Sequence, residues 1–286
     1  MSEPRPCAFC NRTDSPLTKE HVYPRHWKQF FPDVQGPDRA WQFGQDGFLE
    51  RRGANDQFDN QVRDICATCN NGWMMHLDEE VKPFVVPLAQ GDRSHMTAED
   101  ATAFRSWATK LALVRTLQDR AQAQQARPDR FHEFYEDRQP FGGLVVQAAT
   151  CDRRHMDNNT SWVIPGESSA ISNVVTFSIG HLFVQVGIFE PADKEYGPLT
   201  RVQLAAVRHL TKGKVQLVRD GRPWQANGVV TDTELMMARE PAALIGAGEA
   251  MENSMRRVPI KETPGGSFGN PYGVPNINDL EWKTYE

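Results

Sequence analysis

The chain has 286 residues, of which 39% are hydrophobic and 24% charged, so it can build a buried core and global disorder is not expected. The formal net charge of -5 argues against a protein that coats nucleic acid non-specifically, because such binding depends on neutralising phosphates. No run of about 18 apolar residues occurs and the N-terminus lacks an apolar segment, so we expect a cytoplasmic protein with no membrane-spanning helix.

Two cysteine pairs with the same spacing stand in the first part of the chain, Cys7 with Cys10 and Cys66 with Cys69. Two residues between thiolates let one tight turn present both sulfurs to a metal about 2.3 Å away, and two such turns complete a tetrahedral site. A thiol–disulfide redox site would need only one such pair, so the presence of two pairs favours a metal site. We therefore predict a structural Zn²⁺ site, and we interpret the fifth cysteine, Cys151, as an inert buried thiol.

A second motif lies between and just after these pairs. Glu20 directly precedes His21 and Pro24 follows, while Asn70 comes immediately after the last cysteine and is followed by Trp73. In this order the residues resemble the HNH endonucleases, which have the ββα-metal fold. More narrowly, they resemble a bacterial group with the pattern Cys-x-x-Cys, Glu-His-x-x-Pro and Cys-x-x-Cys-Asn-x-x-Trp. The resemblance covers about residues 7–90.

The resemblance implies a β-hairpin followed by a helix, with one divalent ion held between them. His21 would be the general base that deprotonates the attacking water, a task that suits an imidazole because its ordinary pKa is about 6.5. Glu20 and Asn70 would bind the ion, and such oxygen ligands indicate Mg²⁺ or Mn²⁺ rather than a second Zn²⁺. The family more often has Asp and His at these two positions, so the metal preference stays open.

Plainer interpretations exist for the same residues. His21 could be a surface histidine in the turn before Pro24, and without the flanking cysteines that interpretation would be preferred. His26 and His76 stay outside the predicted site, because His76 lies about a turn and a half into the following helix and His26 could simply pack against its neighbours. The whole module could instead be a non-catalytic zinc unit that binds nucleic acid or a protein partner.

We call the adjacent residues Glu20 and His21 the doublet. The segment between the doublet and the second cysteine pair carries the signal of a β-hairpin. Asp46 and Gly47 stand between aromatic residues, which is typical of a hairpin turn. Arg39, Arg51 and Arg52 in this segment are candidates for contact with the phosphates of nucleic acid. Exposed arginines are more often plain solvated surface, so both interpretations stay open.

Helical periodicity appears in three stretches. After the second cysteine pair, an apolar stripe predicts a helix that packs on the hairpin; its members are Trp73, Leu77, Val81 and Phe84. Thr97 is then typical of a helix N-cap, and the apolar spacing through Leu117 predicts a long helix that ends before Pro128. A short helix is expected over residues 130–138.

From residue 144 onward the pattern changes to that of β-strands rich in Val, Ile and Phe. Strands are predicted over residues 144–149, 161–164, 174–179, 182–189 and 215–219. A turn or bulge between two strands of one hairpin is expected around Gly180, and a helix is expected over residues 232–239. Residues beyond 262 are rich in Pro, Gly and Asn, and we expect them to be irregular.

Together these elements predict an α+β protein in three parts. Residues 1–92 would form an HNH nuclease-like ββα-metal module with its zinc knuckles, residues 93–262 a helical connector with an antiparallel-sheet accessory region, and residues 263–286 an irregular tail. Residues 201–224 carry six Lys and Arg side chains against one Asp. This basic stretch could grip nucleic acid or be a solvated face, and a ligand-sensing or oligomerising role is also open.

The sequence therefore favours a metal-dependent endonuclease that cleaves DNA, with a structural Zn²⁺ and a catalytic Mg²⁺ or Mn²⁺. The expected partner is nucleic acid, with no membrane. A double-strand cut would favour a homodimer, and an activating ligand or partner protein is a further option. A role in phage defence or in a mobile element is an extension by family analogy.

Overall fold

The computed structural model of the chain describes residues 5–32, 38–43, 49–55, 57–118, 129–141, 144–163, 172–188, 204, 207–209, 211–231 and 233–234. Residues 1–248 form one compact unit and residues 249–286 a second, and the second lies outside the described residues. The predicted irregular tail and most of the helix predicted over residues 232–239 also lie outside them.

The N-terminal part is built on a two-stranded antiparallel sheet. Strand β1 (Leu17–His21) pairs with β4 (Gln61–Cys66), and the register shifts between Thr18 and Glu20. The chain between these strands forms the 3-10 helix η1 (Arg25–Phe30), strands β2 (Asp38–Phe43) and β3 (Leu49–Asn55), and the short 3-10 helix η3 (Gln57–Asp59). The antiparallel pairing of β2 with β3 agrees with the predicted hairpin, while its predicted turn at Asp46 and Gly47 lies outside the described residues.

Strand β4 runs directly into a helical segment. The single turn α1 (Ala67–Cys69) continues into a wider π-helical turn, η4 (Asn70–Met74), and then into α2 (Met75–Gln90). Gly72 leaves the helical conformation inside η4, which marks a kink. The predicted stripe is buried at Leu77, Val81 and Phe84 and partly buried at Trp73. Helix α2 was predicted to pack on the hairpin, but it packs mainly on α3 and β7. Helix α2 ends at Gly91, whose φ of 86° is the left-handed conformation that favours glycine.

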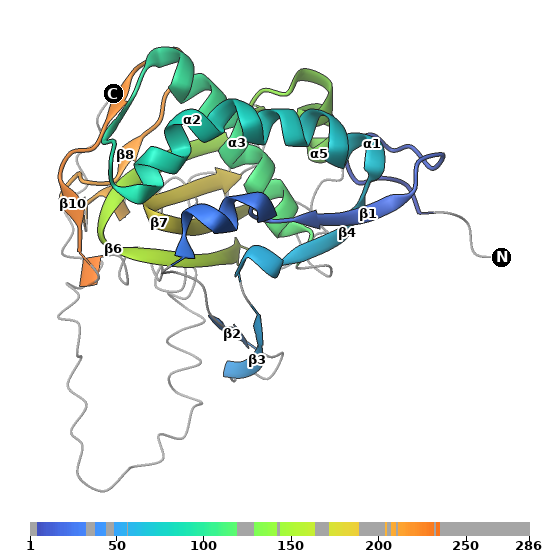
Figure 1. Cartoon of the computed structure of the whole chain (residues 1–286), viewed down its shortest axis with the longest axis horizontal. Helices are drawn as coiled ribbons and strands as arrows, with labels where there is room; N and C mark the ends of the chain where they lie inside the picture. The colour runs from blue at the N-terminus through green and yellow to red at the C-terminus, as the bar shows by residue number, and fades with distance from the viewer. Residues whose placement is uncertain are drawn as a thin grey trace, which may run out of the picture. The chain divides into compact units, whose positions relative to one another are not determined.

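Helix α3 (Ala98–Thr116) begins at the predicted N-cap. The Thr97 side chain accepts a hydrogen bond from the backbone of Asp100, and the Asp100 side chain accepts one from the backbone of Thr97. Helices α2 and α3 contact each other and both pack against the long strands of the C-terminal part (Figure 1). Helix α5 (Asp129–Asp137) matches the short helix predicted over residues 130–138.

The largest sheet is a long antiparallel hairpin of β6 (Leu144–Val163) and β7 (Ser172–Ile188). Four strands were predicted where the structure has these two, because β6 continues from residue 149 to 161 and β7 continues through Gly180 instead of turning there. The pairing shifts register between Thr150 and His155, opposite Gly180 and Leu182, so the predicted alternative of a bulge fits and the turn does not. Gly180 has a φ of 58°, and a Cβ atom at this position would lie 2.1 Å from the carbonyl oxygen of Ala89. A strand glycine therefore marks the close approach of α2 rather than a chain reversal.

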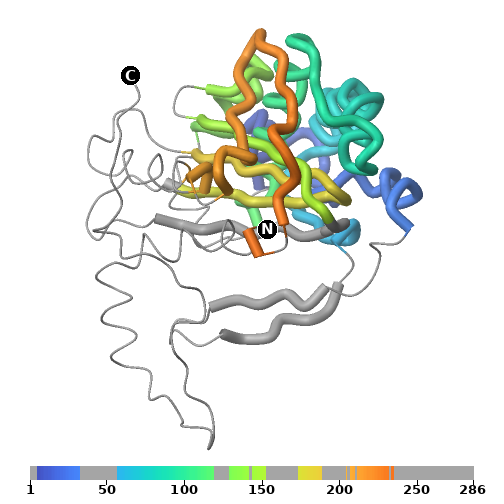
Figure 2. The backbone as a smooth tube through the Cα atoms, turned by 90° about the vertical axis from the view of Figure 1, so that its left-hand side faces the viewer, coloured from blue at the N-terminus to red at the C-terminus, as the bar shows by residue number. Residues whose placement is uncertain are grey.

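Short strands complete the C-terminal part. Strand β8 (Gln216–Leu217) pairs antiparallel with β6, and β10 (Val229–Val230) pairs parallel with it. Strand β9 (Trp224–Gln225) pairs antiparallel with β5 (His95–Met96), just before α3. Figure 2 shows the segment 211–231 running beside the hairpin of β6 and β7. The strand predicted over residues 215–219 is present only as β8.

One apolar core joins residues on both sides of position 92. The Trp27 ring from η1 stacks on Trp107 of α3 at 5.6 Å between ring centroids, and Trp107 meets Phe177 of β7 edge-on at 5.9 Å. The α+β fold class is thus confirmed, whereas the boundary at residue 92 stays a prediction. Among the described helices, none has the length and apolar character that crossing a membrane requires.

Candidate metal centre and the Glu20–His21 doublet

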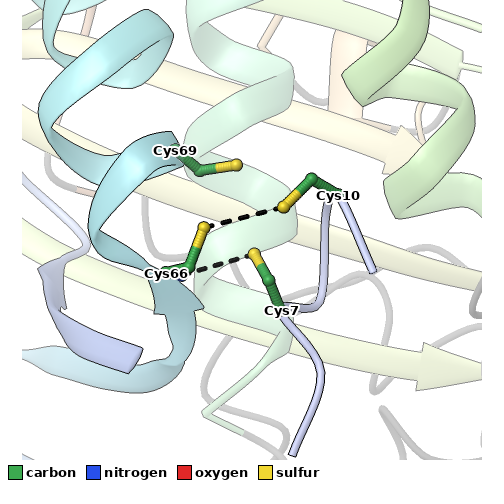
Figure 3. Close-up of side chains that lie close together, drawn as sticks. All are labelled: Cys7, Cys10, Cys66 and Cys69. Atoms are coloured by element: carbon green, nitrogen blue, oxygen red, sulfur yellow. Dashed lines mark hydrogen bonds between the residues drawn. The ribbon is translucent and has the colours of Figure 1, made fainter. Parts of the chain in front are cut away.

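The four paired cysteines come together in space (Figure 3). Cys7 and Cys10 lie in a turn before β1, Cys66 ends β4, and Cys69 lies in α1. Their sulfur atoms all lie within 4.8 Å of one another, and the Cys10 and Cys66 sulfurs are 3.6 Å apart. Zn–S bonds of about 2.3 Å in a tetrahedron would put sulfurs about 3.8 Å apart, so the cluster has the dimensions of a zinc site.

Backbone hydrogen bonds fix the first knuckle to β4. The Ala8 N–H donates to the Asp64 carbonyl at 2.8 Å, and the Cys66 N–H donates to the Cys7 sulfur at 3.3 Å. Within the knuckle, the Asn11 N–H donates to the Cys7 carbonyl at 3.0 Å, and Asn11 adopts a φ of 58°. Two cysteine turns far apart in sequence are therefore held side by side by the main chain.

Hydrogen bonds between the cysteine side chains shift the pKa values of their thiols. The hydrogen bond with Cys69 lowers the pKa of Cys7 to about 4, whereas the same bond raises the pKa of Cys69. Burial raises the pKa of Cys10. Zn²⁺ binds thiolates, so loading the site would release protons from the thiols that still carry them. Four thiolates in a tetrahedral cluster fit Zn²⁺, and in the described part of the chain no other group of three or more His, Cys, Asp or Glu side chains is close enough to share an ion.

An aromatic shell covers the first knuckle. The Phe9 ring meets Trp73 of η4 at 5.5 Å and Phe131 of α5 at 5.3 Å, both edge-on. The His132 Nδ1 atom lies 3.1 Å from the Phe9 carbonyl oxygen. The Arg138 guanidinium lies 4.5 Å from the centre of the Trp73 ring, a cation–π distance. These contacts tie α5 and η4 to the first cysteine turn, where Cys7 is fully buried and Cys10 partly exposed.

Glu20 is turned into the core. The Glu20 Oε1 atom lies 3.5 Å from the Nζ atom of Lys110 in α3, and Lys110 also contacts Asp78 of α2. Burial raises the pKa of Glu20 to about 7; the Lys110 charge opposes that shift and Asp78 adds to it. Burial likewise raises the pKa of Asp78. Burial alone would lower the pKa of Lys110, but the two carboxyl groups raise it above its ordinary value.

His21 has different neighbours. Consecutive strand residues point to opposite faces, and the charged groups that act on the half-buried His21 are Arg25, Asp59 and Lys19. Burial and then Arg25 lower the pKa of His21, while Asp59 opposes them. The Arg25 Nε atom lies 3.6 Å from the Asp59 Oδ1 atom, and the Arg25 side chain is 68% exposed. The histidine is therefore neutral near pH 7 and sits beside an accessible cation.

Asn70 connects the helical segment to β1. Its Nδ2 atom donates to Thr18 Oγ1 and to the Lys19 carbonyl oxygen, both at 3.0 Å. The Thr18 hydroxyl in turn donates to the carbonyl of Ile65 across the sheet. These bonds pin the start of η4 to the strand that carries the doublet, and they leave the Asn70 amide oxygen as the atom that could bind an ion.

The structure thus brings the predicted site residues together unevenly. The four cysteines converge, and Asn70 meets β1 next to the doublet, but Glu20 and His21 face different surroundings. Carboxylate and amide oxygens are the donors that Mg²⁺ and Mn²⁺ prefer, so an ion shared by Glu20 and Asn70 stays a prediction and belongs to the proposal below.

The other candidate residues lie in the β2–β3 hairpin, in η1 and in α2. Arg39 lies in β2, and Arg51 and Arg52 lie in β3, so their backbones share the hairpin; their contact with nucleic acid stays a prediction. His26 and His76 are exposed, and the His26 Nε2 atom pairs with Glu79 Oε1 at 2.8 Å. Both histidines had been left outside the predicted site.

Sequence reasoning missed Lys110 and Asp78. Lys110 is completely buried in a helix stretch that is otherwise mostly apolar, and Asp78 is buried beside Leu77 in the predicted stripe. The available signal was a charged residue inside an apolar pattern at each position. Neither pattern alone shows that the two residues meet, because they lie on different helices.

Comparisons with protein-family models, curated proteins and solved structures found no match to this chain. The resemblance to HNH endonucleases therefore rests on the motif residues themselves. The cysteine cluster supports the zinc part of that resemblance, and the catalytic part belongs to the proposal below.

Proposed function

We propose that the protein is a metal-dependent endonuclease that hydrolyses phosphodiester bonds in DNA. The observation that carries the proposal is the pair of hydrogen bonds from Asn70 to Thr18 and Lys19. They join the helical segment after the second cysteine pair to β1, two and three residues before His21. A candidate base and a candidate metal ligand therefore belong to one zinc-clamped unit of two strands and a helix, the order that the HNH resemblance implies.

In this proposal His21 accepts the proton of the attacking water on a ring nitrogen. Its lowered pKa keeps the imidazole neutral near pH 7, which a general base requires. The exposed Arg25 guanidinium beside it is suited to hold a phosphate. Glu20 and Asn70 hold Mg²⁺ or Mn²⁺, and the ion, when bound, offsets the charge that develops on the phosphate and the leaving oxygen.

A second candidate is a non-catalytic zinc module that binds nucleic acid or a protein. The observation that favours it is the burial of Glu20 against Lys110, because a carboxylate already paired with an ammonium is less available to an ion. The cysteine cluster would then serve only to hold the fold. The two candidates differ in whether His21 matters to any reaction.

The deciding experiment follows conversion of supercoiled plasmid by the zinc-loaded full chain with Mg²⁺ or Mn²⁺. We expect the wild type to nick DNA, and His21→Ala to lower the rate by roughly 10²- to 10⁴-fold, the usual contribution of a general base. His26→Ala is the matched control. It removes an exposed histidine from η1, which follows β1, and should retain activity.

The binding-module candidate replaces the nuclease if wild type and His21→Ala leave DNA equally intact with every ion. Parallel reactions with single-stranded RNA show whether the substrate is RNA instead. Zinc content is measured on each variant, so that a lost zinc clamp is not mistaken for a lost base.

A further inference from the structure

The outward face of the sheet of β1 and β4 carries an excess of positive charge. Glu20 of β1 pairs with Val62 of β4, and both side chains are buried. Successive strand residues point to opposite faces of a sheet, so their neighbours Lys19, His21 and Arg63 belong to the outward face. Lys19 and Arg63 are exposed and His21 is half-buried, as this alternation requires.

The two exposed cations stand opposite each other across the sheet. The pairing shifts register around Lys19, so this one residue of β1 faces two residues of β4, Arg63 and Asp64. The Asp64 Oδ1 atom is already paired with Nη1 of Arg5 at 3.0 Å. Like charges directly opposite each other on a sheet are destabilising. A bound anion would remove that repulsion between Lys19 and Arg63.

This basic face extends to the candidate base. The charges of Arg25 and Lys19 both act on the His21 ring. The Arg25 Nε atom lies 3.6 Å from Asp59 Oδ1, beyond hydrogen-bond distance, and the Arg25 side chain is 68% exposed. Within the residues that the structure describes, neither Lys19 nor Arg63 has a carboxylate at ion-pair distance. The cations around His21 are therefore available to a ligand from solvent.

We propose that Lys19 and Arg63 bind the phosphates of a DNA backbone on the outward face of β1 and β4. The inference rests on the proposed function for its choice of ligand, because His21 lies on the same face. An ammonium offers a point charge and a guanidinium a planar fork of donors, and both suit phosphate oxygens. The chain as a whole carries a net charge of -5, so a polyanion is attracted only where cations gather.

The experiment measures binding of a fluorescein-labelled DNA duplex to the zinc-loaded full chain by fluorescence anisotropy. The buffer contains no added Mg²⁺ or Mn²⁺, so binding is separated from cleavage, and the salt concentration is varied. We expect Lys19→Gln and Arg63→Gln each to weaken binding about 3- to 10-fold at about 50 mM salt. Each should also make the slope of log affinity against log salt shallower by about 1, and the double variant by about 2.

Lys82→Gln is the matched control. It makes the same change in net charge on α2, where the Lys82 ammonium is already paired with Glu79 at 3.2 Å. Its affinity for DNA and its salt slope should equal those of the wild type. Zinc content and thermal midpoint are measured for every variant, and both should be retained because Lys19 and Arg63 are exposed.

The outcomes separate this inference from the proposed function. Wild-type affinity and salt slope in both Lys19→Gln and Arg63→Gln overturn the DNA-binding face, while plasmid cleavage that depends on His21 would leave the nuclease standing. Loss of binding in these two variants supports the face even where His21→Ala has no effect on plasmid, a result that removes the nuclease alone.

Three further results would overturn the inference. The first is a wild type that binds no DNA. The second is a loss in Lys82→Gln as large as in the other variants, because net charge rather than this face would then control binding. The third is tighter binding of a single-stranded RNA of the same length, which would replace DNA as the ligand.

Discussion

Two buried clusters of reactive side chains can be compared in this protein. The cysteine cluster gathers four thiols from two short turns, and its sulfurs lie within 4.8 Å of one another. The charge cluster gathers Lys110, Asp78 and Glu20 from two helices and a strand. Thiolates carry no cation of their own, so in a metal-loaded first cluster a bound Zn²⁺ would supply the compensating charge. The second cluster already contains an ammonium, so it can form without one.

The difference shows in how each cluster depends on the sequence. Both sulfurs of a knuckle come from one turn, so local spacing alone presents them. The charge cluster has no local spacing, since its three members meet only after β1, α2 and α3 have packed. Turn geometry and main-chain hydrogen bonds therefore organise the first cluster, whereas the apolar core organises the second. The predictions below test this distinction, beginning with the largest expected effect.

Cys66→Ser should abolish the zinc site. We expect the purified variant to lose about one equivalent of zinc by elemental analysis and to lose cooperative thermal unfolding, because the metal clamp contributes folding free energy directly. Cys151→Ser is the matched control. Cys151 is buried outside the cysteine cluster, so this variant should keep its zinc. Full zinc content in Cys66→Ser would remove this cysteine from the ligand set.

Lys110→Met should lower the free energy of unfolding by about 3–5 kcal/mol, because it leaves buried carboxylates without their counterion. Urea denaturation measures the change. Lys82→Met is the control: Lys82 pairs with Glu79 at the surface, and such pairs contribute no more than about 1 kcal/mol. An equal loss of unfolding free energy in the two variants would mean that water reaches the charge cluster and screens it.

Glu20 should make stability fall as pH rises. The folded carboxyl keeps its proton until about pH 7, whereas the unfolded carboxyl loses it near 4.5, so the folded state binds more protons between these values. In Mg²⁺- and Mn²⁺-free buffer this contribution should reduce the free energy of unfolding by up to about 3 kcal/mol across that window.

The measurement is the difference in urea midpoints between wild type and Glu20→Gln at pH 4.5 and at pH 7. The glutamine mimics the protonated carboxyl, so the variant should be the more stable protein at pH 7 and similar at pH 4.5. Parallel pH profiles for the two proteins would show that the Glu20 carboxyl titrates as in solvent.

The smallest effect is expected at the surface pair of His26 and Glu79. These groups are 2.8 Å apart but both are about half exposed, so Glu79→Gln should change the free energy of unfolding by less than about 1 kcal/mol. Urea denaturation at low and at high salt checks this. A loss as large as that of Lys110→Met would mean that exposure does not separate the two kinds of ion pair.

Much of the local structure was predictable from the chain. Thr97 and Asp100 cap α3 as their spacing indicates, and Leu77, Val81 and Phe84 are buried as their period requires. A bulge was one of the two alternatives predicted at Gly180, and the register shift opposite it agrees with that. The other alternative, a turn, is absent for a physical reason: glycine favours turns, but here it admits the Ala89 carbonyl against a continuous strand. Only the neighbouring helix distinguishes these two uses, and that helix lies far away in sequence.

By itself, the sequence determined the α+β class, the two cysteine turns and the identity of the candidate doublet, because each depends on spacing within a turn, strand or helix. The convergence of the two turns was predicted from their identical spacing, but tertiary hydrogen bonds between the first turn and β4 bring it about. The tertiary structure alone decided that Glu20 faces the core and His21 does not, and that Lys110 and Asp78 meet Glu20. The reason is that charges can be buried only where several elements together exclude water and supply compensating partners. Local spacing does not encode that condition.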